Sequence, residues 1–100
     1  MSETPVLVVI EVTAVHDVAG LRSYVEQAAR LIGPLGGRVI GQGGKPVEGD
    51  EGFALLVVQR WSSEDAFQAW LASDVYRPLN ELRRASASMR AAIVPLAADA

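Results

Sequence analysis

The chain has 100 residues, half of them hydrophobic, and carries a formal net charge of −3. This length is typical of one domain with one modest core, so we expect a single domain over residues 1–100. The chain contains no cysteine, which excludes disulfides, thiolate nucleophiles and cysteine-based zinc sites and fits a reducing cytoplasm. The acidic balance argues against a nucleic-acid partner. No apolar run approaches the ~20 residues of a membrane-spanning helix, so we expect no membrane partner.

The first predicted element is a strand at residues 5–12, PVLVVIEV, which is apolar at nearly every position and therefore expected to be buried on both faces. Residues 16–37 then place apolar side chains at three- and four-residue steps, as in an amphipathic helix. Asp17 is its predicted N-cap, and Gly36 or Gly37 supplies the left-handed residue that ends it.

A glycine-rich stretch, LGGRVIGQGGKP at residues 35–46, raises the question of phosphate binding. A P-loop requires serine or threonine after its lysine, whereas Lys45 precedes Pro46. A dinucleotide-binding fingerprint requires a helix directly after the glycines. Here the stretch contains a short predicted strand, residues 38–42, and leads into a polar loop. The glycines therefore predict a helix end and bends in the chain, not a phosphate site.

The second half of the chain adds a strand, two helices and a final strand. We expect these elements at residues 53–61, 62–74, 76–87 and 91–97, respectively. Ser62 is the predicted cap of the first of these helices. Pro95 predicts that the final strand lies at a sheet edge, because proline cannot donate to a β-ladder.

The βαββαβ order, with right-handed crossovers, predicts an α+β fold with a ferredoxin-like split sheet of strand order 4-1-3-2. Both helices of this fold cover the same face of the sheet. Residues 5–12 and 53–61, the two central strands, are nevertheless apolar on both faces. An exposed apolar patch of roughly several hundred Å² is larger than soluble monomers usually carry. We therefore expect a homodimer that forms through the sheet face.

Polar side chains are expected to gather at one end of the sheet, where they predict a catalytic site. Glu11 and His16 are candidate general bases, and Tyr76 is a candidate proton donor. Substrate contacts are expected from Gln42, Trp70 and Arg83, with the arginine as an anion clamp. Each residue also has a structural interpretation, as a solvated surface group or as part of the core. One histidine and scattered carboxylates offer no metal-ligand spacing, and we expect neither metal nor cofactor.

The segments GGRVI, VEG and LLVVQRWSSEDAFQAWLASDVYRPLNELRRAS resemble the domain of unknown function 1330 family, and the resemblance covers residues 6–96. The most specific matches are Gly36-Gly37-Arg38, Glu48-Gly49, Ala66, Trp70, Ser73, Tyr76 and Arg83. Trp61 departs from the family pattern, which usually has phenylalanine there. The resemblance implies a dimeric α+β barrel and no established reaction. Proteins with this barrel include cofactor-independent monooxygenases, heme-degrading enzymes, dehydratases and isomerases.

Three functions remain open at this point. In the first, each subunit binds a small, partly apolar organic molecule between sheet and helices and catalyses proton transfer or oxygenation without a cofactor. In the second, the chain is a non-catalytic binding or stress-related dimer, which predicts no cavity large enough for a ligand of ~300 Å³. In the third, it handles heme, and His16 is the natural axial ligand.

Overall fold

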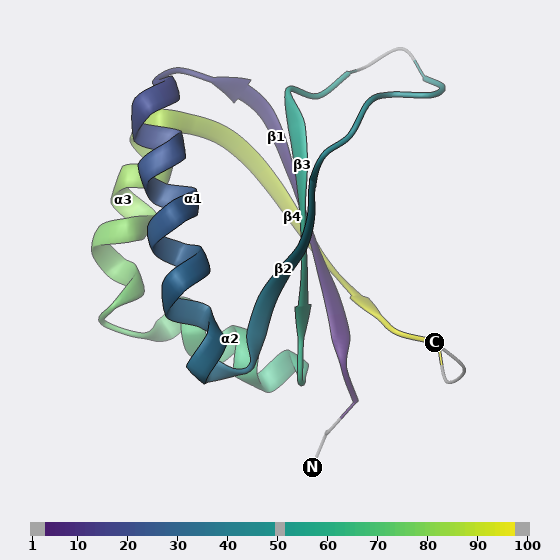
Figure 1. Ribbon diagram of the computed structural model, residues 1–100, viewed down its shortest axis with the longest axis vertical. Helices are drawn as coiled ribbons and strands as arrows, with labels where there is room; N and C mark the ends of the chain where they lie inside the picture. Colours follow the sequence, from purple (N-terminus) through teal and green to yellow (C-terminus); the bar gives the residue numbers. More distant parts are fainter. Residues whose placement is uncertain (1–3, 50–51, 98–100) are drawn as a thin grey trace.

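A computed structural model of the chain describes residues 4–49 and 52–97 and shows one sheet with helices on one face (Figure 1). The elements in chain order are β1 (Val6–Val15), α1 (Val18–Ile32), the 3-10 helix η1 (Gly33–Leu35), β2 (Gly37–Gly43), β3 (Leu55–Trp61), α2 (Glu64–Ala72), α3 (Tyr76–Ser86) and β4 (Ala87–Pro95). The strand order is β2-β3-β1-β4, and all neighbouring strands are antiparallel. The predicted α+β fold and strand order are therefore confirmed. No helix in these two ranges has the length and apolarity needed to cross a membrane.

Side-chain caps begin the first two α-helices. The Asp17 carboxylate accepts a hydrogen bond of 3.1 Å from the Gly20 amide, as its position in the sequence predicts. The prediction of Ser62 as the cap of α2 was wrong by one residue. Ser63 has the extended backbone of a cap, and its hydroxyl accepts from the Ala66 amide at 3.1 Å.

Two strands are longer than the sequence pattern predicts. β1 continues to Val15, and β4 begins at Ala87, four residues before the predicted strand. The reason is that these two ends pair with each other, Val15 opposite Ala87, across a bulge between Val12 and Ala14. A ladder between distant segments extends both strands into sequence that carries no strand pattern of its own.

The core lies between the sheet and the helices, and Trp61 is its largest fully buried side chain. Alternation along β1 and β3 directs Val8, Val12 and Trp61 toward the helices, where they are completely buried. The Trp61 ring meets Phe67 of α2 edge-on, with ring centroids 5.4 Å apart. This contact fixes α2 against the sheet and thereby sets the position of the α2–α3 turn.

Gly37 lies directly against the Trp61 ring, so replacing it with alanine is expected to lower the free energy of unfolding by ~1–3 kcal/mol. A Cβ atom at Gly37 would lie 2.5–2.7 Å from three ring atoms of Trp61. Gly41 of the same strand offers a matched control, because a Cβ atom there meets nothing within 4 Å. Urea unfolding of the Gly37→Ala and Gly41→Ala variants measures the difference. Equal stabilities would contradict this account of the glycine.

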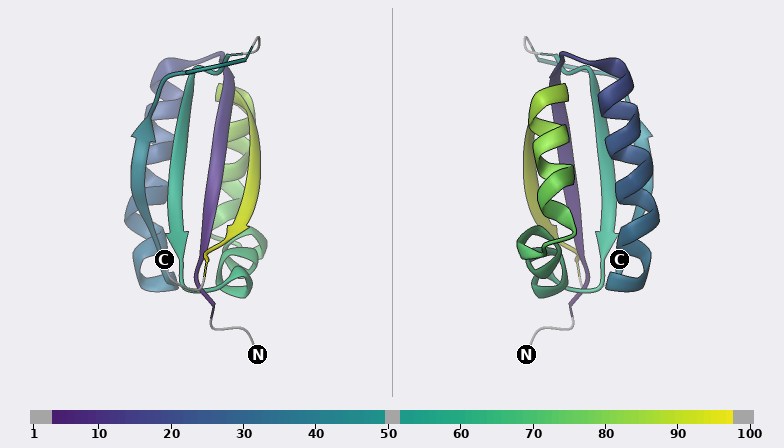
Figure 2. Two further views of the ribbon diagram at one scale, coloured as in Figure 1. Left: turned by 90° about the vertical axis from the view of Figure 1, so that its right-hand side faces the viewer. Right: turned by 90° about the vertical axis from the view of Figure 1, so that its left-hand side faces the viewer.

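The opposite face of the sheet carries no helix (Figure 2). Leu7, Val9, Leu56 and Val58 alternate with the core residues and therefore point to this bare face. We use "bare face" below for the surface formed by these four residues and their neighbours on β2 and β4.

Candidate functional site

A pocket of about 470 Å³ lies between the sheet and the helices, on the side of β4. Its floor comes from β1, β3 and β4, and its walls come from α1, α2 and α3. The apolar lining includes Ile10, Phe67, Trp70, Met89 and Ile93. A lining of mostly apolar and aromatic side chains with a few polar groups is typical of small-molecule sites.

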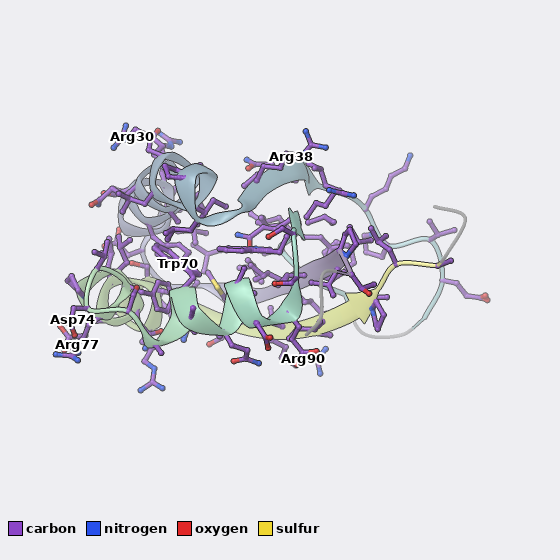
Figure 3. All side chains as sticks on the ribbon, turned by 90° about the horizontal axis from the view of Figure 1, so that it is seen from below. Arg30, Arg38, Trp70, Asp74, Arg77 and Arg90 are labelled. Atoms are coloured by element: carbon purple, nitrogen blue, oxygen red, sulfur yellow. The ribbon has the colours of Figure 1, made fainter. Side chains whose placement is uncertain are left out.

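The turn between α2 and α3 places two aromatic side chains in this pocket. The Ser73 hydroxyl donates to the Trp70 carbonyl at 2.7 Å and accepts from the Tyr76 amide at 3.3 Å, so one side chain joins both helix ends. The rings of Trp70 and Tyr76 consequently lie with centroids 4.9 Å apart and a tilt of 53°. Figure 3 shows Trp70 inside the molecule, whereas the labelled charged residues lie at its periphery.

Two tyrosine hydroxyls meet at the pocket wall. Tyr24 of α1 and Tyr76 of α3 are both buried, and their phenolic oxygens are 3.3 Å apart in a hydrogen bond. Burial raises the pKa of Tyr24 well above its ordinary value, and the hydrogen bond to Tyr76 adds to the rise, while the positive charge of Arg83 opposes it. Tyr24 is therefore a neutral phenol throughout the physiological pH range, and one of the two phenolic hydrogens remains for a ligand.

Arg83 contributes the positive charge of the pocket. Its Nε and one terminal nitrogen donate to the Asn80 side-chain oxygen at 3.0 and 2.7 Å, which holds the guanidinium in place one turn along α3. Arg83 is partly buried and forms no ion pair with a carboxylate in the described part of the chain. A guanidinium has five N–H donors, so three remain beyond those used by Asn80.

Gln59 of β3 is the polar group of the floor, and the sequence analysis missed it. Its side chain is 6% exposed, and its Oε1 accepts from the Trp61 indole nitrogen at 2.8 Å. An indole N–H can only donate, so the glutamine oxygen must face Trp61 and the amide nitrogen must face away from it. A signal was present in the sequence: Gln59 is a polar residue in register with Val57 and Trp61 on the core side of an apolar strand.

Three of the six predicted site residues lie together. Trp70, Tyr76 and Arg83 all line the pocket. Glu11 does not join them, because β1 continues past it and alternation turns it to the bare face. There it pairs with Arg90 of β4, whose Nε donates to the carboxylate at 2.9 Å. The predicted convergence of Glu11 with Arg83 is thus wrong, since the two residues lie on opposite faces of the sheet.

His16 and Gln42 also lie outside the pocket. His16 follows the C-terminal end of β1, which is at the other end of the sheet from α2 (Figure 1), and its exposed ring hydrogen-bonds the Ser88 hydroxyl at 3.0 Å. Gln42 belongs to β2, the edge strand farthest from β4, and lines a separate groove beside α1. The sequence-based placement failed because it took α2 to end at the same end of the sheet as β1. Among residues 4–49 and 52–97, no group of three or more histidine, aspartate or glutamate side chains could hold a metal.

Comparison with known proteins adds the family. A family model described as a domain of unknown function, DUF1330, matches residues 5–97. The chain belongs to this family. A search of curated proteins found no match.

Solved structures share the fold of this DUF1330 protein. A protein of unknown function from Rhodopseudomonas palustris has a TM-score of 0.81 at 20% identity, over 96% of this chain and 85% of that chain. SnoaB, a cofactor-independent oxygenase from Streptomyces nogalater, has a TM-score of 0.72 at 19% identity, over 94% of each chain. A dimeric ferredoxin-like protein of unknown function from Bacteroides fragilis has a TM-score of 0.60 at 9% identity, over 92% of this chain and 96% of that chain. At these identities the likeness concerns the fold alone.

Proposed function

We propose that this protein binds a small, planar, partly apolar organic molecule in the pocket between α2, α3 and β4. The observation that carries the proposal is a cavity of about 470 Å³ with aromatic walls and a few polar donors at one side. Trp70 and Phe67 present ring surface to a planar ligand, and Tyr76 and Arg83 supply directional polar contacts. The alternative, a non-catalytic dimer without small-molecule chemistry, predicts no cavity large enough for a ligand of ~300 Å³. The volume of this pocket exceeds that size.

We further propose that the chemistry on this ligand is cofactor-independent proton transfer or oxygenation. The likeness in fold to SnoaB, a cofactor-independent oxygenase, supports this reaction class. The roles of Trp70 and Arg83 are substrate binding, and Tyr76 is the proton donor. We assign Glu11, His16 and Gln42 no role in ligand binding or in the reaction, because they lie away from the pocket.

We also propose a homodimer through the bare face. The dimeric ferredoxin-like protein from Bacteroides fragilis supports this assembly, as does the apolar character of Leu7, Val9, Leu56 and Val58. Association would cover side chains that no helix of the same subunit covers. The pocket lies between the sheet and the helices, and the proposed interface is the opposite face of the sheet, so ligand binding and dimerisation are separately testable.

The neutral compound para-nitroanisole is expected to quench the fluorescence of Trp70 in a saturable manner. Trp61 serves as an internal reference, because it is fully buried and does not line the pocket. The Trp70→Phe variant should therefore keep its remaining emission unquenched.

Ala91 lines the pocket, and the Ala91→Leu variant should bind para-nitroanisole ~10-fold more weakly because the larger side chain occupies space that the ligand needs. Ala85→Leu on the exposed side of α3 is the matched control. Absence of saturable quenching, or equal affinity in both leucine variants, would overturn the proposed pocket.

A further inference from the structure

We infer that the pocket selects its ligand in the anionic form, as an aromatic oxyanion whose charged oxygen lies against the Gln59 amide, a tyrosine hydroxyl and Arg83. This inference rests on the proposed function and specifies the ligand class of that same site. It follows from the polar side chains that line the pocket: α1, α3 and β3 supply hydrogen-bond donors, and α3 supplies a positive charge. Two further polar residues border the pocket, Gln68 on the exposed side of α2 and Arg90 of β4, which pairs with Glu11.

The Gln59 amide nitrogen is the first donor. Trp61 holds the side-chain oxygen at 2.8 Å, so the two N–H groups of Gln59 cannot exchange places with it. Gln59 is only 6% exposed, yet its side-chain amide nitrogen has no hydrogen-bond acceptor in the described part of the chain. Gln59 lines this pocket and also a second, much smaller cavity beside α1, so its side chain borders space that a ligand in the pocket can reach. A buried donor without a partner favours a ligand that brings an acceptor.

Arg83 is the second donor and the source of charge. It is oriented by a neutral amide, Asn80, and no described carboxylate neutralises it. A partly buried guanidinium favours an anion that restores the charge balance in a medium of lower dielectric constant than water. The electrostatic effect of Arg83 reaches the Tyr24 phenol, so the charge acts inside the pocket.

The tyrosine pair is the third donor. Two phenols have two hydrogens, and their mutual hydrogen bond at 3.3 Å uses one of them. The other hydrogen is available to an oxygen of a ligand. None of the residues that line this pocket in the described ranges is aspartate, glutamate or histidine, so no lining carboxylate repels an anion. The ligand's proton is released to solvent, and the anion that remains receives donors from three directions.

The probe for this inference is para-nitrophenol, whose anion is coloured. Selective binding of the anion must lower the pKa of the bound probe, and each unit of the shift corresponds to tenfold tighter binding of the phenolate than of the phenol, about 1.4 kcal/mol. We expect a shift of at least ~1 unit with the wild-type protein, read from visible absorbance as a function of pH at saturating protein. A bound probe that titrates at the same pH as the free probe would overturn the inference.

Two variants assign the effect to the named residues. Arg83→Gln should remove most of the shift, while Arg84→Gln, which removes the same charge from the neighbouring exposed position of α3, should leave it intact. Gln59→Glu keeps an oxygen for the Trp61 N–H but replaces the donor with a negative group, so the pKa of the bound probe should rise. If Arg83→Gln and Arg84→Gln behave alike, the anion site is not where we place it.

Neutral para-nitroanisole separates the two proposals. If it fails to bind the wild-type protein, the proposed pocket function fails. If it binds and para-nitrophenol shows no pKa shift, only the inference of anion selection fails. Its retained affinity in the Arg83 and Gln59 variants shows that each variant is folded with an intact pocket. The ratio of affinities for para-nitrobenzoate and para-nitrophenolate then tells whether the oxyanion is a carboxylate or a phenolate.

Discussion

Replacing Val58 with glutamate is expected to convert the proposed homodimer into a monomer of 10.6 kDa. Val58 lies opposite Val9 in the pairing of the two central strands, at the middle of the bare face. Burial of ~400 Å² of apolar surface per subunit would contribute on the order of 10 kcal/mol before the entropy of association is subtracted. A glutamate at this position places an unpaired carboxylate in that buried area.

The expected effect is large because twofold symmetry doubles it. A buried charge without a partner costs ~3 kcal/mol or more, and each subunit contributes one. Since every ~1.4 kcal/mol is a factor of ten, the ~6 kcal/mol from both subunits should raise the dissociation constant ~10⁴-fold or more. Light scattering at micromolar concentration measures the change. Val47→Glu is the matched control, because Val47 is 93% exposed in the loop after β2.

A wild-type protein that scatters as a 10.6 kDa monomer would contradict the dimer directly. The same experiment also checks that the pocket is independent of the interface. Because the pocket lies between sheet and helices, the Val58→Glu variant should keep its affinity for para-nitroanisole if the monomer is folded. Loss of both properties together with loss of the folded state would show instead that the subunit is unstable alone.

Replacing Trp61 with alanine is expected to lower the free energy of unfolding by ~3–5 kcal/mol, the largest effect of any single core substitution here. The side chain is fully buried, it packs edge-on against Phe67, and Gly37 lies against its ring. The change opens a cavity that these neighbours cannot fill. It also leaves the Gln59 side-chain oxygen without its donor.

Urea unfolding at one fixed protein concentration measures the Trp61→Ala effect, because dimer stability depends on concentration. Domains of this size are stable by ~5–15 kcal/mol, so the loss is a large fraction of the total. Val75→Ala is the control: Val75 is 54% exposed, and its truncation should change stability by ~0.5 kcal/mol at most. A loss below ~1 kcal/mol in Trp61→Ala would contradict the packing described for this ring.

The candidate site divides into residues whose position follows from local pattern and residues whose position does not. Tyr76 and Arg83 are seven residues apart and share one side of α3 by helix periodicity, and the turn at Ser73 places Trp70 of α2 beside Tyr76. Glu11 depends instead on the pairing of β1. It lies within the ladder opposite Leu56 and Arg90, and alternation along the strand turns it away from the helices.

Gln59 shows the opposite case, a site residue with a weak local signal. Its alternation with Val57 and Trp61 places it on the core side, but the direction of its amide depends on the indole donor beside it. The sequence alone does not show that the Gln59 side-chain oxygen is bound by Trp61 or that the residue lines a pocket.

By itself, the amino-acid sequence determined the βαββαβ order, the central position of the two apolar strands, the cap at Asp17 and the edge position of Pro95. Each of these follows from local periodicity, from the backbone limits of single residues, or from the handedness of crossovers. Only the tertiary structure decided the lengths of β1 and β4, the pairing of Glu11 with Arg90, and the meeting of Tyr24, Tyr76, Gln59 and Arg83 around one pocket. These features depend on contacts between residues far apart in the chain, and neither composition nor spacing records such contacts.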